Sequence, residues 1–78
     1  MVRKPLLRCL GEEVRERRKA LGLSQIALAH EADVHPNVVG RLERGEYNPS
    51  VSLLQLLIGP LKIELSELMA GAERRRNA

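Results

Sequence analysis

The chain has 78 residues, the length of one small domain, and its 14 leucines with a single aromatic residue, Tyr47, require an aliphatic core. The net charge of +3 comes from the two ends, because the chain without Arg3, Lys4 and residues 73–76 holds 8 basic and 9 acidic residues, so charge alone does not identify a nucleic-acid-binding protein. No apolar run approaches the roughly 20 residues of a membrane span, and the lone Cys9 excludes a disulfide within the chain, so we expect a soluble cytoplasmic protein.

A first helix is expected after a short basic arm, residues 1–5. Apolar residues recur at helical spacing on one face of this helix: Leu7, Leu10, Val14 and Leu21. Gly22 is a natural C-terminal stop, and Ser24 offers an N-cap oxygen to a second helix from Gln25 to about Ala32. Only three residues follow before the next helix, so the two helices must meet at a sharp angle. Asp33 can adopt the left-handed conformation that a tight turn needs.

The third helix, from Pro36 to about Arg44, is rich in poor helix formers. Pro36 is tolerated because its missing N–H costs nothing at the first helical position, but Gly40 in the interior costs roughly 1 kcal/mol relative to alanine. At about 100° per residue, the helix has an apolar packing face made of Val38, Val39 and Leu42. Its polar face carries Asn37, Gly40, Arg41 and Arg44, and Glu43 lies at the border of the packing face.

Two further helices complete an all-α domain over residues 6–70. Ser50 is expected to cap a fourth helix from Val51 towards Ile58, where Gly59-Pro60 should end or kink it. A fifth short helix is expected over about Leu65–Ala70. The Arg-rich tail that follows, residues 71–78, is expected to be disordered, and added phosphate contacts are the alternative.

The polar face of the third helix has the chemistry of a reader of the DNA major groove. Asparagine pairs bidentately with adenine N6 and N7, and arginine with guanine O6 and N7. Gly40 lies between Asn37 and Arg41 without a side chain, which would let a base pair approach closely. From these residues alone an ordinary solvated helix face remains the alternative, because asparagine and arginine are common on protein surfaces.

Three motifs occur in order along the chain: "GLSQ" at 22–25, "RLERGEYNPS" at 41–50 and "ELSELM" at 64–69. Together they make the run Leu10–Met69, 60 of the 78 residues, resemble the helix-turn-helix domain of the phage-repressor/Cro-like (XRE) regulators without a gap. The resemblance implies a compact five-helix bundle of the lambda-repressor-like type. It also implies a sequence-specific DNA-binding transcription regulator.

The resemblance further implies roles for individual residues. Bases would be read by Pro36, Asn37, Gly40 and Arg41. The DNA backbone would be contacted by Ser24, Gln25, His35, Arg44, Tyr47 and Asn48. Arg18 would form a buried or half-buried structural ion pair with Glu43. His35 stands where the family usually has a cap hydroxyl, so it would either approach a phosphate or serve only as an exposed cap.

A homodimer on a near-palindromic operator is the expected working form, with two third helices about 34 Å apart in successive major grooves. Its interface is assigned to apolar residues that a small core does not bury comfortably: Leu61, Ile63, Leu65, Leu68 and Met69. Double-stranded DNA is the expected partner, and no small-molecule ligand domain is expected. We also expect no cofactor, metal or enzyme activity, because His30, His35 and Cys9 lack metal-site spacing and no catalytic grouping stands out. Alternatives on the same fold are an antitoxin, a restriction–modification controller, or a protein–protein interaction module.

Overall fold

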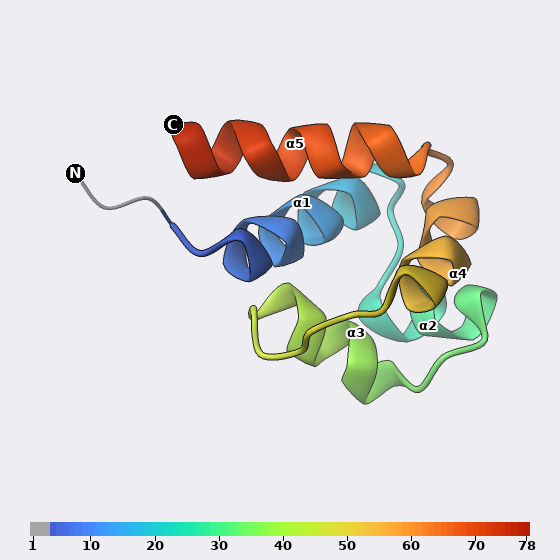
Figure 1. The fold of residues 1–78 in the computed structure, drawn as a ribbon. Helices are drawn as coiled ribbons and strands as arrows, with labels where there is room; N and C mark the ends of the chain where they lie inside the picture. The colour runs from blue at the N-terminus through green and yellow to red at the C-terminus, as the bar shows by residue number, and fades with distance from the viewer. Residues whose placement is uncertain (1–3) are drawn as a thin grey trace.

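The computed structural model describes residues 4–78, which form five α-helices and no strand (Figure 1). The helices are α1 (Leu6–Ala20), α2 (Gln25–Ala32), α3 (Pro36–Glu43), α4 (Val51–Leu61) and α5 (Leu65–Asn77). The all-α fold expected from the sequence is therefore confirmed. Residues 1–3 of the expected basic arm, Arg3 included, lie outside the described residues.

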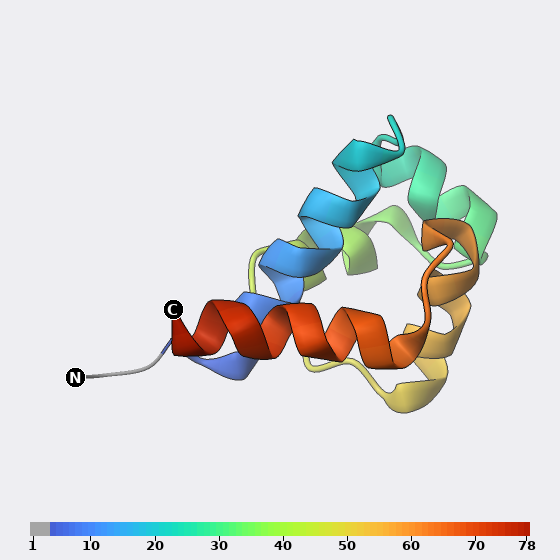
Figure 2. The ribbon, with the colours of Figure 1, turned by 90° about the horizontal axis from the view of Figure 1, so that it is seen from above.

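The first helix lies between two others. α5 packs along one side of α1 and crosses over it, while α3 packs against the opposite side (Figures 1 and 2). α2 pairs with α3, and α4 closes the bundle against α2 and α5. This arrangement leaves the outer face of α3 on the side of the molecule away from α5 (Figure 1).

Serine side chains start two of the helices where the sequence predicts them. The Ser24 hydroxyl accepts a hydrogen bond from the Ala27 amide at 2.9 Å, and the Ser50 hydroxyl accepts one from the Leu53 amide at 3.0 Å. Each bond satisfies an amide that has no partner within its own helix. The predicted starts of α2 and α4 are therefore confirmed.

The core is aliphatic and draws on all five helices. Its buried side chains are Cys9, Leu10, Val14, Leu28, Ala29, Ala32, Val39, Leu42, Leu54, Leu57, Leu61, Leu68 and Ala72. Leu21 was predicted on the apolar face of the first helix, but 40% of it is exposed. The reason is that α1 ends at Ala20, so Leu21 is the capping residue and has left the packed face.

Two small residues let α1 approach its neighbours closely. A Cβ added to the buried Gly11 would lie 2.2 Å from the backbone oxygen of Leu42, at the end of α3. A Cβ added to Gly71 would lie 2.3 Å from the carboxylate of Glu13, at the contact between α1 and α5. Neither close approach was predicted, because the pattern of one helix does not show which residue faces a group 30 or more positions away.

The sequence predicts that Gly59-Pro60 ends α4 near Ile58 or kinks it, and the predicted end near Ile58 is wrong. The helix continues to Leu61, and Lys62 ends it in the left-handed conformation with φ 59°. Proline disfavours a helical residue before it mainly through that residue's Cβ, and Gly59 has none. Pro60 also lies in the last turn, where the loss of one amide breaks only one terminal hydrogen bond. Leu61 is thereby carried into the core.

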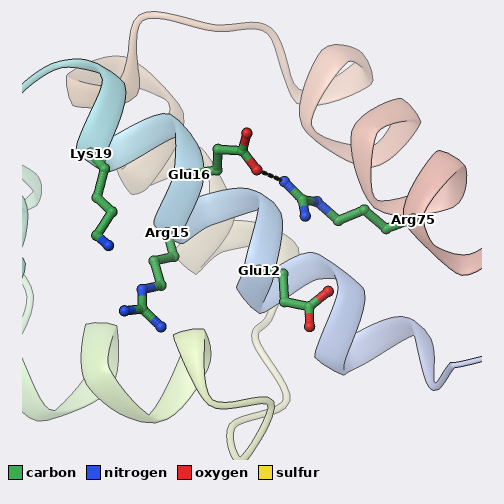
Figure 3. Close-up of a pocket in the computed structure, with 5 residues that line it drawn as sticks. All are labelled: Glu12, Arg15, Glu16, Lys19 and Arg75. Atoms are coloured by element: carbon green, nitrogen blue, oxygen red, sulfur yellow. Dashed lines mark hydrogen bonds and ion pairs between the residues drawn. The ribbon is translucent and has the colours of Figure 1, made fainter.

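The C-terminal arginines belong to a helix, and the predicted disordered tail is wrong. α5 runs seven residues beyond the predicted end at Ala70, to Asn77. Arg75 Nε donates to Glu13 Oε1 at 2.8 Å, and Arg75 also pairs with Glu16 (Figure 3). Gly71, which resembles a helix stop in the sequence, is buried against α1. Contacts with α1, about 60 residues away in the chain, thus extend the helix.

Glu13 is the centre of this α1–α5 contact. Its carboxylate is almost buried and accepts hydrogen bonds from Arg17 and Arg75, each at 2.8 Å. Burial raises the pKa of Glu13, but these two hydrogen bonds and the two positive charges outweigh burial and hold the pKa below its ordinary value. Figure 3 shows Arg75 reaching towards α1, while Arg15 and Lys19 extend from the side of α1 away from α5.

No helix in the described range, residues 4–78, combines the length and apolar character needed to cross a membrane.

Candidate nucleic-acid interface

A tight turn joins α2 to α3. Asp33 adopts the left-handed conformation, with φ 58° and ψ 45°, and its amide bonds to the carbonyl of His30. The amide of Val34 bonds to the carbonyl of Ala29 at 2.9 Å. The left-handed Asp33 predicted from the sequence is confirmed, and it supplies the sharp angle between the two helices.

The two faces of α3 divide mostly as the helical angles predicted. Val39 and Leu42 are completely buried and Val38 is half-buried, which explains why β-branched residues occur in this helix. Pro36 and Asn37 are exposed at its start, and Arg41 and Arg44 are exposed further along.

Gly40 does not lie open to solvent, so its predicted place on the exposed face is wrong. It is buried beneath two side chains of the protein. A Cβ at this position would lie 3.3 Å from Arg44 Nη1 and 3.5 Å from Gln25 Oε1. The missing side chain therefore makes room for Gln25 and Arg44, which helical angles within α3 alone could not show.

Arg18, Glu43 and Gln25 hold α1, α2 and α3 together. Arg18 meets the carboxylate of Glu43 through two hydrogen bonds, Nε to Oε2 at 2.7 Å and Nη2 to Oε1 at 3.0 Å. Gln25 Nε2 donates to the same Oε1 at 3.0 Å, and Arg18 Nη1 donates to the carbonyl of Leu23 at 2.8 Å. Every buried side-chain polar atom within residues 4–78 has a partner.

This network is an ion pair removed from water. The side chains of Arg18 and Glu43 are only 9% and 2% exposed. The hydrogen bond to Glu43 raises the pKa of Arg18 above its already high ordinary value, in spite of burial. Since the pair fixes the end of α3 to α1, it holds the exposed residues of α3 in one orientation. The ion pair expected between these two residues is present.

The loop after α3 carries the predicted backbone-contacting residues. Gly45 turns the chain with φ +75°, and Arg44 and Asn48 are exposed. The Tyr47 ring packs against the core, and the guanidinium of Arg41 lies over it at 5.4 Å from the ring centre. Tyr47 thus links the loop to the core and restrains an arginine of α3.

His35 is the N-cap of α3. Its Nδ1 accepts a hydrogen bond from the Asn37 amide at 3.1 Å, and the residue is exposed. An acceptor Nδ1 requires the neutral ring with its proton on Nε2. Ser24, the corresponding cap of α2, is also exposed. Both caps therefore lie beside amides at helix N-termini, which carry partial positive charge.

The residues assigned to a dimer interface are not all available for one. Leu61 and Leu68 are 2% and 0% exposed inside a single copy of the chain, so their assignment to the interface is wrong. Once α5 is placed over α1, the core has room for both. Ile63, Leu65 and Met69 are half-buried and pack against that core. Apolar residues that are more exposed than these lie elsewhere, since Ile26 and Val51 are each 69% exposed.

One residue beside the predicted site was missed. Glu46 lies between the backbone-contacting residues and touches two arginines of the site. Its carboxylate accepts from Arg44 Nε at 3.1 Å, and its carbonyl oxygen accepts from Arg41 Nη2 at 3.4 Å. A glutamate two residues after Arg44 was the only signal for this contact in the sequence.

The helix-turn-helix family model HTH_3 matches residues 14–68, which includes the α2–α3 unit and its supporting helices. The chain belongs to this helix-turn-helix family. It is 33% identical over 60 residues to the immunity repressor protein of Bacillus phage phi105. That match covers 77% of this chain, which spans only 42% of the repressor's length.

Solved structures of other regulators match between 80% and 95% of this chain. The restriction–modification controller protein C.AhdI from Aeromonas hydrophila is 40% identical, with a TM-score of 0.78 over 80% of this chain and 94% of its own. The clp gene regulator ClgR from Corynebacterium glutamicum is 26% identical, with a TM-score of 0.90 over 95% of both chains. The resemblance to XRE-type regulators inferred from the sequence is thereby confirmed.

Proposed function

We propose that the chain is a sequence-specific DNA-binding transcription regulator that acts in the cytoplasm as a homodimer. Two α3 helices would enter successive major grooves of a near-palindromic operator, about 34 Å apart. The observation that carries the proposal is that α3 exposes polar side chains while its opposite face is held in the core. Asn37 and Arg41 are exposed on a helix whose other face is fixed by Val39, Leu42 and the buried Glu43.

Base reading is assigned to the start and outer face of α3. Asn37 and Arg41 are the residues whose side chains offer paired hydrogen bonds to base edges, and Pro36 is exposed beside them. Gly40 supports this reading indirectly, since it gives space to Gln25 and Arg44. The stacking of Arg41 on Tyr47 limits the freedom that Arg41 loses on binding.

Backbone contacts are assigned to the helix N-termini and to the loop after α3. Ser24 and His35 lie at the N-termini of α2 and α3, where amides and the helix dipole favour a phosphate. Arg44, Tyr47 and Asn48 lie in the loop at the opposite end of α3 from His35. Gln25 donates to Glu43, so its main role is to brace α3, with a phosphate contact left to its remaining N–H. The dimer face uses apolar residues accessible in one copy, which include Ile63, Leu65 and Met69.

A controller of restriction–modification genes is the favoured kind of regulator. The likeness to C.AhdI, a controller protein, covers 94% of that chain at 40% identity. The phage immunity repressor is 33% identical over the 60 residues that it shares with this chain. The proposal therefore follows the more identical of these two relatives.

The test is selection of random duplexes on the purified protein near 150 mM salt, where purely electrostatic binding is suppressed. We expect an enriched inverted repeat. Asn37→Ala or Arg41→Ala should relax the sequence at defined positions, because each good base contact is worth about 1–3 kcal/mol of discrimination. Gln55→Ala, an exposed amide on α4, is the matched control and should leave the repeat unchanged. A folded protein that enriches no sequence would refute the proposal.

A further inference from the structure

The loop proposed to hold the DNA backbone contains an acidic side chain that is already bound to an arginine. Glu46 Oε1 accepts a hydrogen bond from Arg44 Nε at 3.1 Å. The carbonyl oxygen of Glu46 accepts from Arg41 Nη2 at 3.4 Å. Both arginines assigned to DNA therefore touch Glu46 in the free protein.

The backbone fixes the place of Glu46. Gly45 turns with φ +75°, its amide bonds to the carbonyl of Leu42 at 3.0 Å, and the Glu46 amide bonds to the carbonyl of Arg41 at 2.9 Å. A Cβ at Gly45 would lie 3.1 Å from the Cα of Arg8, so α1 also confines this turn. On the following side, Tyr47 packs against the core. Glu46 thus lies between two anchored residues.

Helix stability does not explain a glutamate at this position. Glu46 follows the C-terminus of α3, where the helix dipole favours positive charge and disfavours a carboxylate. The Arg44 and Glu46 side chains are 58% and 56% exposed, and ion pairs as exposed as this contribute little to folding. The contact is better explained by what both groups meet outside the protein.

A carboxylate resembles a phosphate to an arginine, because both offer paired acceptor oxygens and negative charge. We infer that Glu46 competes with DNA phosphate for Arg44 and so sets the electrostatic part of DNA affinity. This inference rests on the proposed function, in which Arg44 contacts the DNA backbone. Arg44 donates its Nε–H to Glu46, so a paired contact with a phosphate through Nε requires Arg44 to release Glu46. The Glu46 carboxylate, bound or free, also repels that phosphate.

The consequence is weaker binding wherever phosphate contacts act alone. Non-specific binding is almost entirely electrostatic, so Glu46 removes affinity from the encounters that lack other contacts. A duplex whose bases also contact Asn37 and Arg41 keeps the binding free energy of those base contacts, which does not depend on the Glu46 carboxylate. Glu46 is therefore a residue that limits how much of the binding free energy comes from charge.

The experiment compares Glu46→Gln, Arg44→Ala and the double variant, with Glu73→Gln as control. Glutamine keeps the shape of glutamate but loses its charge. Glu73 is a matched control because it pairs with Arg76 at 3.6 Å in an exposed contact on α5, away from the loop (Figure 1). The measurement is fluorescence anisotropy of a labelled random-sequence duplex, titrated with protein at several salt concentrations between about 50 and 200 mM. Circular dichroism checks that each variant is folded.

We expect Glu46→Gln to bind the random duplex about three- to tenfold more tightly at the lowest salt. The plot of log K against log salt should steepen by about 0.9, the value for one additional neutralised phosphate. In the Arg44→Ala background, Glu46→Gln should give a smaller gain, because only the direct repulsion between the Glu46 carboxylate and the phosphate is then removed. Glu73→Gln should change affinity by less than about twofold, since Glu73 belongs to α5, which lies across α1 from α3 (Figure 1).

Two results would overturn the inference. The first is a Glu46→Gln slope equal to that of the wild type, and the second is a gain in affinity that is as large without Arg44 as with it. In both cases wild-type binding to DNA would stand, and the proposed function would be left to the duplex-selection experiment. If neither the folded wild type nor Glu46→Gln binds any duplex, the proposed function and the inference fail together.

Discussion

Replacement of Gly11 by alanine should destabilise the protein more than any other glycine-to-alanine change within a helix. The new Cβ would lie 2.2 Å from the carbonyl oxygen of Leu42 and 2.8 Å from that of Glu43. Ordinary contacts of a Cβ begin near 3.4 Å, and both clashing atoms are backbone. α1 must therefore move away from α3 by roughly 1 Å, since no side chain can rotate to relieve the overlap.

Two terms set the magnitude. Alanine in place of glycine gains about 1 kcal/mol of helix propensity, and overpacking of a filled interior costs about 1–3 kcal/mol or more. The shift also stretches the Arg18–Glu43 hydrogen bonds, which are 2.7 and 3.0 Å long and join the same two helices. Loss of even part of a buried ion pair adds to the cost, so we expect a net loss of about 2–3 kcal/mol. For a domain this small, that lowers the melting temperature by roughly 10–20 °C.

The assay is urea unfolding followed by far-ultraviolet circular dichroism, which suits a helical chain without tryptophan. Gly40→Ala is the matched control, because its Cβ would meet only the ends of the flexible Arg44 and Gln25 side chains, at 3.3 and 3.5 Å. Both variants gain the same helix propensity, so the difference between them isolates the backbone clash. If Gly11→Ala unfolds at the same urea concentration as the wild type or higher, the close packing of α1 on α3 is refuted.

Three further predictions concern the site and its supports. Gly40→Ala should raise the free energy of unfolding by up to about 1 kcal/mol. It should nevertheless weaken operator binding about three- to tenfold, because the new side chain displaces Gln25 and Arg44. Equal operator affinities of the variant and the wild type in anisotropy titrations would contradict this prediction. Glu43→Gln should cost about 3 kcal/mol in urea unfolding, because it leaves the Arg18 charge buried without a counterion, and Arg18→Met combined with Glu43→Leu should recover most of it. The folded-state pKa of Glu13 is lowered, so its contribution to stability is complete above the unfolded pKa of about 4.3 and is lost as pH falls through the folded value. In thermal melts from pH 7 to pH 3, the melting temperature of Glu13→Gln should therefore fall less than that of the wild type. Parallel curves of melting temperature against pH would show that the α1–α5 ion pairs do not contribute to stability.

Local chemistry made most of the helix boundaries predictable. Ser24 and Ser50 cap their helices through bonds to residues three positions away, and Gly22 and Asp33 adopt left-handed turns. Each of these features depends on neighbours within one helical turn, so the sequence contains all the information needed. The packing face of α3 was predictable for the same reason, since its angular order depends only on helix geometry.

Predictions failed where a distant segment decides the outcome. The Arg-rich end of the chain is helical because Arg75 and Gly71 meet Glu13 on α1, about 60 residues earlier. Gly40 is buried because Gln25 and Arg44 cover it, and Leu61 and Leu68 belong to the core because α5 crosses α1. The contacts of Arg75 and Gly71 with α1, and of Gln25 with Gly40, leave no periodic pattern in their own helices.

The sequence by itself determined the fold class, the helix-turn-helix and the residues offered on the outer face of α3, because capping, helical periodicity and turn conformation act over a few residues. The tertiary structure alone decided that Gln25 covers Gly40 and that Glu46 touches both Arg41 and Arg44, whereas the family resemblance had already implied the pairing of Arg18 with Glu43. These contacts join side chains through space, and the distances between their atoms, rather than their positions along the chain, determine which groups remain free to meet DNA.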